Sequence, residues 1–131
     1  MNCLDARFLI DYTNEARERH DDAVAFYESE GGPIALTSTL ALYEVYRGVC
    51  YYRSPADLPE VRRRLSWVHP VAFTGHVAGV AAEIHAELER RGEMVNGADV
   101  LIAATAMAHD VPVVTVDDAF ERVDGLDVRS Y

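Results

Sequence analysis

The chain of 131 residues contains no lysine, only two cysteines and no long hydrophobic segment. Cys3 and Cys50 are too few for the disulfide framework of a small secreted domain and lack metal-binding spacing, so we expect two buried thiols. The longest apolar run, residues 100–108, is far shorter than the roughly 20 residues that cross a bilayer. Asp5 and Arg7 also interrupt any signal-peptide core. These absences predict a cytoplasmic protein without a membrane partner.

The composition is that of an ordinary soluble globule, with 50% hydrophobic and 26% charged residues. The length suits a single domain over residues 1–131 with a core of its own. All 12 basic residues are arginines, and 22 acidic residues bring the formal net charge to -10. Either adaptation to high salt or a GC-rich genome would explain this composition. The charge argues against passive nucleic-acid binding, unless the ionic strength is high or bound divalent cations supply positive charge.

Short apolar segments alternate with amphipathic helical patterns along the chain. Strands are expected at residues 1–5, 34–36, 71–73, 113–116 and 128–130. Helices are expected at residues 6–12, 14–29, 40–52, 58–67, 75–91 and 97–109. Residues 30–33 (EGGP) should end the second helix, and Asn96 should cap the last. The alternation predicts an α/β fold, a three-layer α/β/α sandwich with a central, mostly parallel sheet of four to five short strands.

Two acidic residues directly follow expected strands, Asp5 after the first and Asp117 after the fourth. In open α/β sheets the functional crevice lies beyond the carboxyl ends of the strands. Local explanations are also available, because aspartate is a favoured N-cap and readily forms Asx turns. For each residue the functional and the local interpretation stay open at this point.

Two further acids lie on expected helices. Asp99 is in the first turn of a helix that is apolar on nearly every side. The helix dipole favours an acid at this position, which is a local explanation. A helix that is apolar all round should be internal, however, and would direct the acid into a cleft. Glu44 could form a helical pair with Arg47, worth roughly 0.2–0.5 kcal/mol. Gly48, one turn further on, costs about 1 kcal/mol relative to alanine. Its presence suggests that something approaches the backbone beside Glu44.

Convergence of these four acids would have a chemical consequence. Two carboxylates about 5 Å apart repel by roughly 3 kcal/mol at an effective dielectric constant of 20. Such a cluster requires protonation or bound cations. Carboxylate oxygens without paired histidine or cysteine favour Mg²⁺ or Mn²⁺ over Zn²⁺, and such a site is suited to phosphodiester hydrolysis.

Four ordered segments of the chain resemble motifs of the PIN-domain family, and specifically of its VapC-type toxins. They are residues 4–10 (LDARFLI), 44–49 (EVYRGV), 92–104 (GEMVNGADVLIAA) and 115–120 (TVDDAF). Ala6 departs from the small hydroxyl residue that is common in the family at this position. The resemblance implies a metal-dependent endoribonuclease that forms a homodimer and is inhibited by a small cognate antitoxin blocking its site.

The resemblance also implies roles for single residues. Asp5 and Asp99 would be the core ligands of Mg²⁺ or Mn²⁺, and Glu44 and Asp117 would bind a second metal ion or orient the attacking water. Thr115 could hold a carboxylate or water through its hydroxyl. Asp118 is an alternative to Asp117 as the fourth acid.

Other interpretations were weighed alongside this one. The chain could be a catalytically silent PIN-like module that binds RNA or protein, or a housekeeping PIN ribonuclease without an antitoxin. The basic run Arg62–Arg64 is either a solvated helix face or a contact for the RNA backbone. The tyrosines of the helix at 40–52 either pack in the core and a dimer interface or stack on bases; they are Tyr43, Tyr46, Tyr51 and Tyr52.

Overall fold

A computed structural model describes residues 1–30 and 34–131. Its sheet has five parallel strands in the order β3-β2-β1-β4-β5. The strands are β1 (Asn2–Leu4), β2 (Ala35–Ser38), β3 (Val68–Val71), β4 (Val113–Val114) and β5 (Val128–Arg129). The α-helices are α1 (Ala6–Thr13), α2 (His20–Ser29), α3 (Thr39–Tyr52), α4 (Leu58–Arg64), α5 (Gly75–Arg91) and α6 (Gly97–Ala108). Two short 3₁₀ helices are η1 (Pro55–Asp57) and η2 (Asp118–Arg122).

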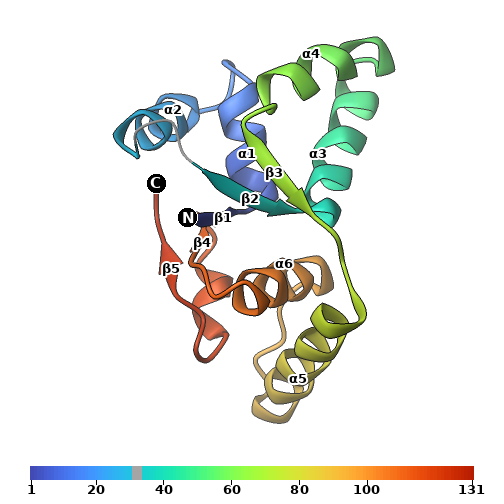
Figure 1. Ribbon diagram of the computed structural model, residues 1–131, viewed down its shortest axis with the longest axis vertical. Helices are drawn as coiled ribbons and strands as arrows, with labels where there is room; N and C mark the ends of the chain where they lie inside the picture. Colours follow the sequence, from blue (N-terminus) through green and yellow to red (C-terminus); the bar gives the residue numbers. More distant parts are fainter. Residues whose placement is uncertain (31–33) are drawn as a thin grey trace.

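Helices cover both faces of the sheet, with α1 to α4 on one side and α5 and α6 on the other (Figure 1). This division follows from the right-handedness of parallel crossovers. The chain moves in one direction from β1 through β2 to β3, which places α1 to α4 on the same face. It then returns across the sheet to β4, so α5 and α6 fall on the opposite face. The expected three-layer α/β/α sandwich with a parallel sheet is confirmed.

The core lies on both faces of the sheet around the central strand β1 and its neighbours. Cys3 of β1 and Val113 and Val114 of β4 are completely buried, as expected for strands covered on both faces. The prediction that α6 is internal is also confirmed, because Ile102 and its alanine neighbours are fully buried. Burial of one such aliphatic side chain contributes roughly 1.5–3 kcal/mol. No helix in the described part of the chain is long and apolar enough to cross a membrane.

The expected start of the second helix is wrong. The helix expected from residue 14 begins only at His20, because the side chain of Asn14 accepts a hydrogen bond of 3.0 Å from the Ala16 N–H and favours a turn. The helix ends at Ser29 as expected, but residues 31–33 of the proposed stop lie outside the described residues.

Three further bounds differ in the second half of the molecule. The strand expected at residues 71–73 lies at Val68–Val71, where Pro70 is tolerated because β3 is an edge strand. Helix α4 ends at Arg64 rather than at residue 67. The strand expected at residues 113–116 is only two residues long, because the chain turns at Thr115 to begin the approach to η2.

The carboxyl edge of the sheet is held together by buried hydroxyl groups. Thr37 Oγ1 donates a hydrogen bond of 2.8 Å to the backbone oxygen of Leu4, which joins the ends of β1 and β2. The next residue, Ser38, accepts a bond of 3.2 Å from the Leu40 N–H and caps α3. These contacts fix the start of α3 against the point where the chain leaves β1.

Candidate functional site

The candidate acids lie around the carboxyl ends of β1 and β4. Asp5 follows β1, Asp117 follows β4, and the two strands are neighbours in the sheet. At this junction the strand order reverses, because the chain runs from β1 towards β3 on one side and from β4 to β5 on the other. Open α/β sheets form their ligand crevices at such a junction.

Asp5 is buried, with only 5% of its surface exposed. Although it stands at the N-cap position of α1, its carboxylate makes no capping hydrogen bond to the helix residues that the structure describes. Its Oδ2 instead accepts a bond of 2.8 Å from Thr115 Oγ1. Burial raises the pKa of Asp5 to about 6; the Thr115 bond opposes this rise, and the charges of Glu44 and Asp117 add to it.

Asp99 lies in the first turn of α6, where Asn96 already caps the helix through a bond of 3.0 Å from the Ala98 N–H. The residue is partly buried. Burial raises the pKa of Asp99 to about 6, and the charges of Asp5 and Asp117 contribute to the rise. The acid is therefore electrostatically linked to the ends of both β1 and β4.

Glu44 lies in the middle of α3 and is also half-buried. Burial raises its pKa, the charge of Asp99 raises it further, and the nearby Arg47 partly compensates. The alternative of a local ion pair is not supported, because no Glu44–Arg47 contact within 4.0 Å occurs between these two described residues. Glu44 thus belongs to the same charged group as Asp99.

Asp117 has both a local and a shared role. Its Oδ1 accepts a hydrogen bond of 2.9 Å from the Ala119 N–H, so the expected Asx turn is present at the start of η2. Its N–H donates to Thr115 Oγ1 at 3.0 Å, which ties it to the residue that holds Asp5. Asp118 is exposed, whereas the charge of Asp117 acts on both Asp5 and Asp99. Asp117 is therefore better placed than Asp118 as the fourth acid.

The four acids come from separate elements, and their charges influence one another through Asp5, Asp99 and Glu44. Within the described residues, no three or more His, Cys, Asp or Glu side chains converge closely enough to hold a metal ion between them. Mg²⁺ commonly keeps several water ligands and binds through only one or two carboxylates. An all-carboxylate donor set of this kind fits a hydrated Mg²⁺ or Mn²⁺ ion and offers no soft ligand for other metals.

One buried acid was not singled out from the sequence. Asp11 in α1 is fully buried; it accepts bonds of 2.8 Å from Arg17 Nε and 2.7 Å from the Tyr131 hydroxyl, and its backbone oxygen contacts His20 Nδ1 at 2.8 Å. These contacts join α1, the following turns and the carboxyl terminus. The one sequence signal for this role is an acid inside the otherwise apolar stretch of residues 8–12.

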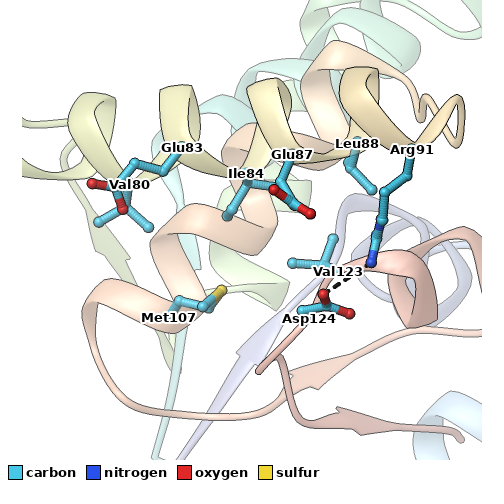
Figure 2. A pocket seen from close by; sticks show the side chains of 9 residues that line it. All are labelled: Val80, Glu83, Ile84, Glu87, Leu88, Arg91, Met107, Val123 and Asp124. Carbon is cyan, nitrogen blue, oxygen red and sulfur yellow. Dashed lines mark hydrogen bonds and ion pairs between the residues drawn. The ribbon is translucent and has the colours of Figure 1, made fainter.

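A cavity of about 190 Å³ lies apart from the acids, between α5, α6 and the segment after η2 (Figure 2). Met107 and Val123 line its apolar part, and Arg91 closes one end. Arg91 donates a bond of 2.9 Å to Asp124 Oδ2 and another to the backbone oxygen of Arg122. The cavity is therefore bordered by an ion pair and contains none of the four acids.

Thirty-five chains of solved structures match the fold, and several of them come from VapBC or other toxin–antitoxin complexes. The VapBC complex of Salmonella typhimurium bound to DNA is 24% identical, with a TM-score of 0.84 over 98% of this chain and 96% of that one. FitAcB of Neisseria gonorrhoeae gives the same values. Mycobacterium tuberculosis VapC20, described as a toxin that cleaves the sarcin–ricin loop, is 17% identical, with a TM-score of 0.76 over 92% and 93% of the two chains.

At such low identities these likenesses establish the fold and nothing finer. No curated protein sequence matches the chain. A family model provides the decisive comparison, since it spans nearly the whole sequence and all four of the motifs that carry the candidate acids. That model, for the PIN domain, matches residues 3–126, and this chain therefore belongs to the PIN-domain family.

Proposed function

We propose that this protein is an endoribonuclease that depends on Mg²⁺ or Mn²⁺ and acts as the toxin of a VapBC-type toxin–antitoxin pair. One observation carries the proposal. Burial raises the pKa values of Asp5, Asp99 and Glu44, and the charges of other acids of the group raise each of them further. Carboxylates held in this way at neutral pH favour a divalent cation between them.

Each residue has a distinct task in this proposal. A divalent cation, when bound, would activate water and stabilise charge on the phosphodiester oxygens. Asp5 and Asp99 would hold the cation, with Thr115 Oγ1 keeping the Asp5 carboxylate in place by the 2.8 Å bond. Glu44 and Asp117 would bind a second cation or orient the attacking water. Asp117 keeps one carboxylate oxygen for this task while the other caps η2.

Family membership and the similar folds support the proposed biological role. Membership of the PIN-domain family supports nuclease chemistry, and the similar folds include proteins solved as VapBC complexes. By this analogy the chain would form a homodimer, cleave RNA in the cytoplasm and be inhibited by a small cognate antitoxin that covers the acidic site. The cation also relieves the conflict between the net charge of -10 and a polyanionic substrate.

The proposal is tested by incubating the purified protein with structured RNA and Mn²⁺. Cleavage should occur, stop on addition of EDTA, and be lost in Asp5→Asn and Asp99→Asn. Asp21→Asn, at an exposed acid of α2, is the matched control and should cleave as the wild type does. Cleavage that persists in EDTA or in the Asp5/Asp99 double variant would refute the metal mechanism. Binding of RNA without any cleavage would identify a silent module.

A second experiment separates a toxin from a housekeeping ribonuclease. Expression of the chain by itself should arrest growth of the host, and co-expression of the adjacent small reading frame should restore growth. An Asp99→Asn variant should be harmless in the same cells. Normal growth with active wild-type enzyme would contradict the toxin assignment while leaving the nuclease assignment intact.

A further inference from the structure

A groove of about 350 Å³ lies between α1 and α3, and its lining includes Val45, the residue that follows Glu44. Its lining from α3 includes Gly48, Tyr52 and Arg53, and its lining from α1 and the following turn includes Asn14 and Arg17. Gly48 lies one helical turn after Glu44, and Tyr52 lies two turns after it. The groove therefore extends about 12 Å along α3 from Glu44. A few nucleotides could span this length.

The charge of the groove is opposite to that of the molecule. Of the described residues that line it, the two charged ones are both arginines, Arg17 and Arg53, although the chain carries a net charge of -10. Arg17 is held by the buried Asp11 at 2.8 Å. Arg53 forms only a partly exposed pair of 3.6 Å with Asp57, and exposed pairs of this kind contribute little. The Arg53 side chain can therefore exchange Asp57 for another anion at a small cost in free energy.

The end of the groove carries two unusually exposed aromatic side chains. Tyr51 and Tyr52 are 80% and 84% exposed, and their rings meet edge to face with centroids 4.8 Å apart. Burial in the core, one of the roles considered for these tyrosines, is therefore excluded for this pair within the single chain. Exposed aromatic rings beside cationic side chains are the elements with which proteins bind single-stranded nucleic acid.

Gly48 adds a third observation in the floor of the groove. A Cβ atom built on this residue would have no described atom within 4 Å, so packing does not require glycine here. Glycine in a helix interior lowers stability relative to alanine. The open backbone at this point gives a ligand close access to α3 one turn from Glu44.

We infer that the groove between α1 and α3 binds a short single-stranded tract of the RNA substrate beside the cleavage position, with Arg53 contacting phosphate and Tyr51 and Tyr52 stacking on bases. This inference rests on the proposed ribonuclease function. RNA is favoured over a second copy of the chain because an arginine beside two exposed aromatic rings matches both the phosphates and the unpaired bases of a single strand. The tract would enter the acidic site past Gly48.

The test measures binding by fluorescence anisotropy of labelled, mixed-sequence single-stranded RNA in EDTA, where cleavage is stopped. The Tyr51→Ala/Tyr52→Ala variant should bind at least about tenfold more weakly than the wild type. Arg53→Ala should reduce the slope of log affinity against log salt by about one. The control is Tyr43→Ala, which removes another exposed tyrosine of α3 on a different side of the helix. It should bind RNA as the wild type does.

Sedimentation analysis of the same variants completes the experiment. Unchanged RNA affinity in the double tyrosine variant, in a protein that cleaves RNA, overturns the inference and leaves the proposed function standing. If the double tyrosine variant loses self-association but keeps its RNA affinity, the inference is also overturned. Tyr51 and Tyr52 would then belong to a contact between copies of the chain. A wild-type protein that neither binds nor cleaves RNA overturns the proposed function itself, and the inference with it.

Discussion

Thr115 Oγ1 donates a hydrogen bond of 2.8 Å to Asp5 Oδ2, between residues 110 positions apart in the sequence. The bond joins the carboxyl ends of the neighbouring strands β1 and β4, and the same oxygen accepts a bond of 3.0 Å from the Asp117 N–H. One hydroxyl group therefore fixes two of the four acids relative to each other. It holds Asp5 in an orientation that its helix-capping position alone would not select.

Replacement of Thr115 by valine removes this hydroxyl while preserving the shape of the side chain. The bond lowers the pKa of Asp5, so its loss should raise that pKa further above its value of about 6. The protein should also lose about 1–3 kcal/mol of stability at neutral pH, because a buried carboxylate is left without its donor. Carboxyl NMR titration measures the first effect and urea unfolding the second. Thr115→Ser, which keeps the hydroxyl, should resemble the wild type in both.

Stability in EDTA should fall as the pH rises from about 4 to about 7. The pKa of Asp5 is about 6 in the folded protein against 3.8 in its ordinary state, so the folded form binds the proton more tightly. Asp5 makes its full contribution to the free energy of unfolding below the pKa that it has in the unfolded chain. This contribution is lost as the pH rises through the pKa that it has in the folded protein. The shift corresponds to about 3 kcal/mol. Asp99 acts in the same direction.

Chemical unfolding at a series of pH values measures this dependence. Asp5→Asn should flatten the curve over the interval between the two pKa values, since asparagine cannot titrate. Added Mn²⁺ should restore stability at neutral pH in the wild type. Equal pH dependence in wild type and variant would show that Asp5 ionises normally and would remove the electrostatic basis of the site.

Tyr131→Phe should destabilise the fold without affecting the acidic site. The variant loses the bond of 2.7 Å from the tyrosine hydroxyl to Asp11, leaving the buried carboxylate with Arg17 alone. A hydrogen bond to a charged group contributes about 1.5–3 kcal/mol, which sets the expected loss in urea unfolding. Tyr51→Phe is the matched control, because this exposed hydroxyl should contribute nothing measurable. A stable Tyr131→Phe protein would show that Arg17 suffices to hold Asp11.

Gly48→Ala should separate stability from binding. The added methyl group meets open space and improves the helix, so the free energy of unfolding should increase by up to about 1 kcal/mol. If RNA passes close to α3 at this residue, the same methyl group should weaken RNA binding. Thermal unfolding and anisotropy measured on one preparation give both values. A gain in stability with unchanged RNA affinity would place the RNA elsewhere.

Local patterns predicted much of the fold because they report local physics. Asn96, expected to cap the last helix, accepts a hydrogen bond of 3.0 Å from the Ala98 N–H at the start of α6. Gly92 closes α5 with a φ of 65° that glycine adopts readily. The start of α2 was misjudged because the Asn14 side chain competes with helix formation through a bond to the backbone. Strand lengths were misjudged because parallel strands depend on partners that are distant in sequence.

The site shows the same division between local and long-range information. Asp5 and Asp117 could be selected because both follow strands, and parallel strands place their carboxyl ends at one edge. The resemblance implied that the Thr115 hydroxyl could hold a carboxylate, but the residues alone could not identify that carboxylate as Asp5, because the bond depends on β4 lying beside β1. The role of Asp11 was hidden for a related reason, since its partner Tyr131 comes from the opposite end of the chain.

The central claim is that two acids that follow β1 and β4 share one divalent-cation site with the acids of α3 and α6. Calorimetric titration with Mn²⁺ at neutral pH tests this claim most directly. The wild type should bind Mn²⁺, and Asp5→Asn and Asp99→Asn should each weaken the affinity at least about tenfold, a change of about 1.4 kcal/mol. Asp21→Asn should have no effect. Equal Mn²⁺ affinity in the wild type and in the Asp5 and Asp99 variants would contradict a shared site.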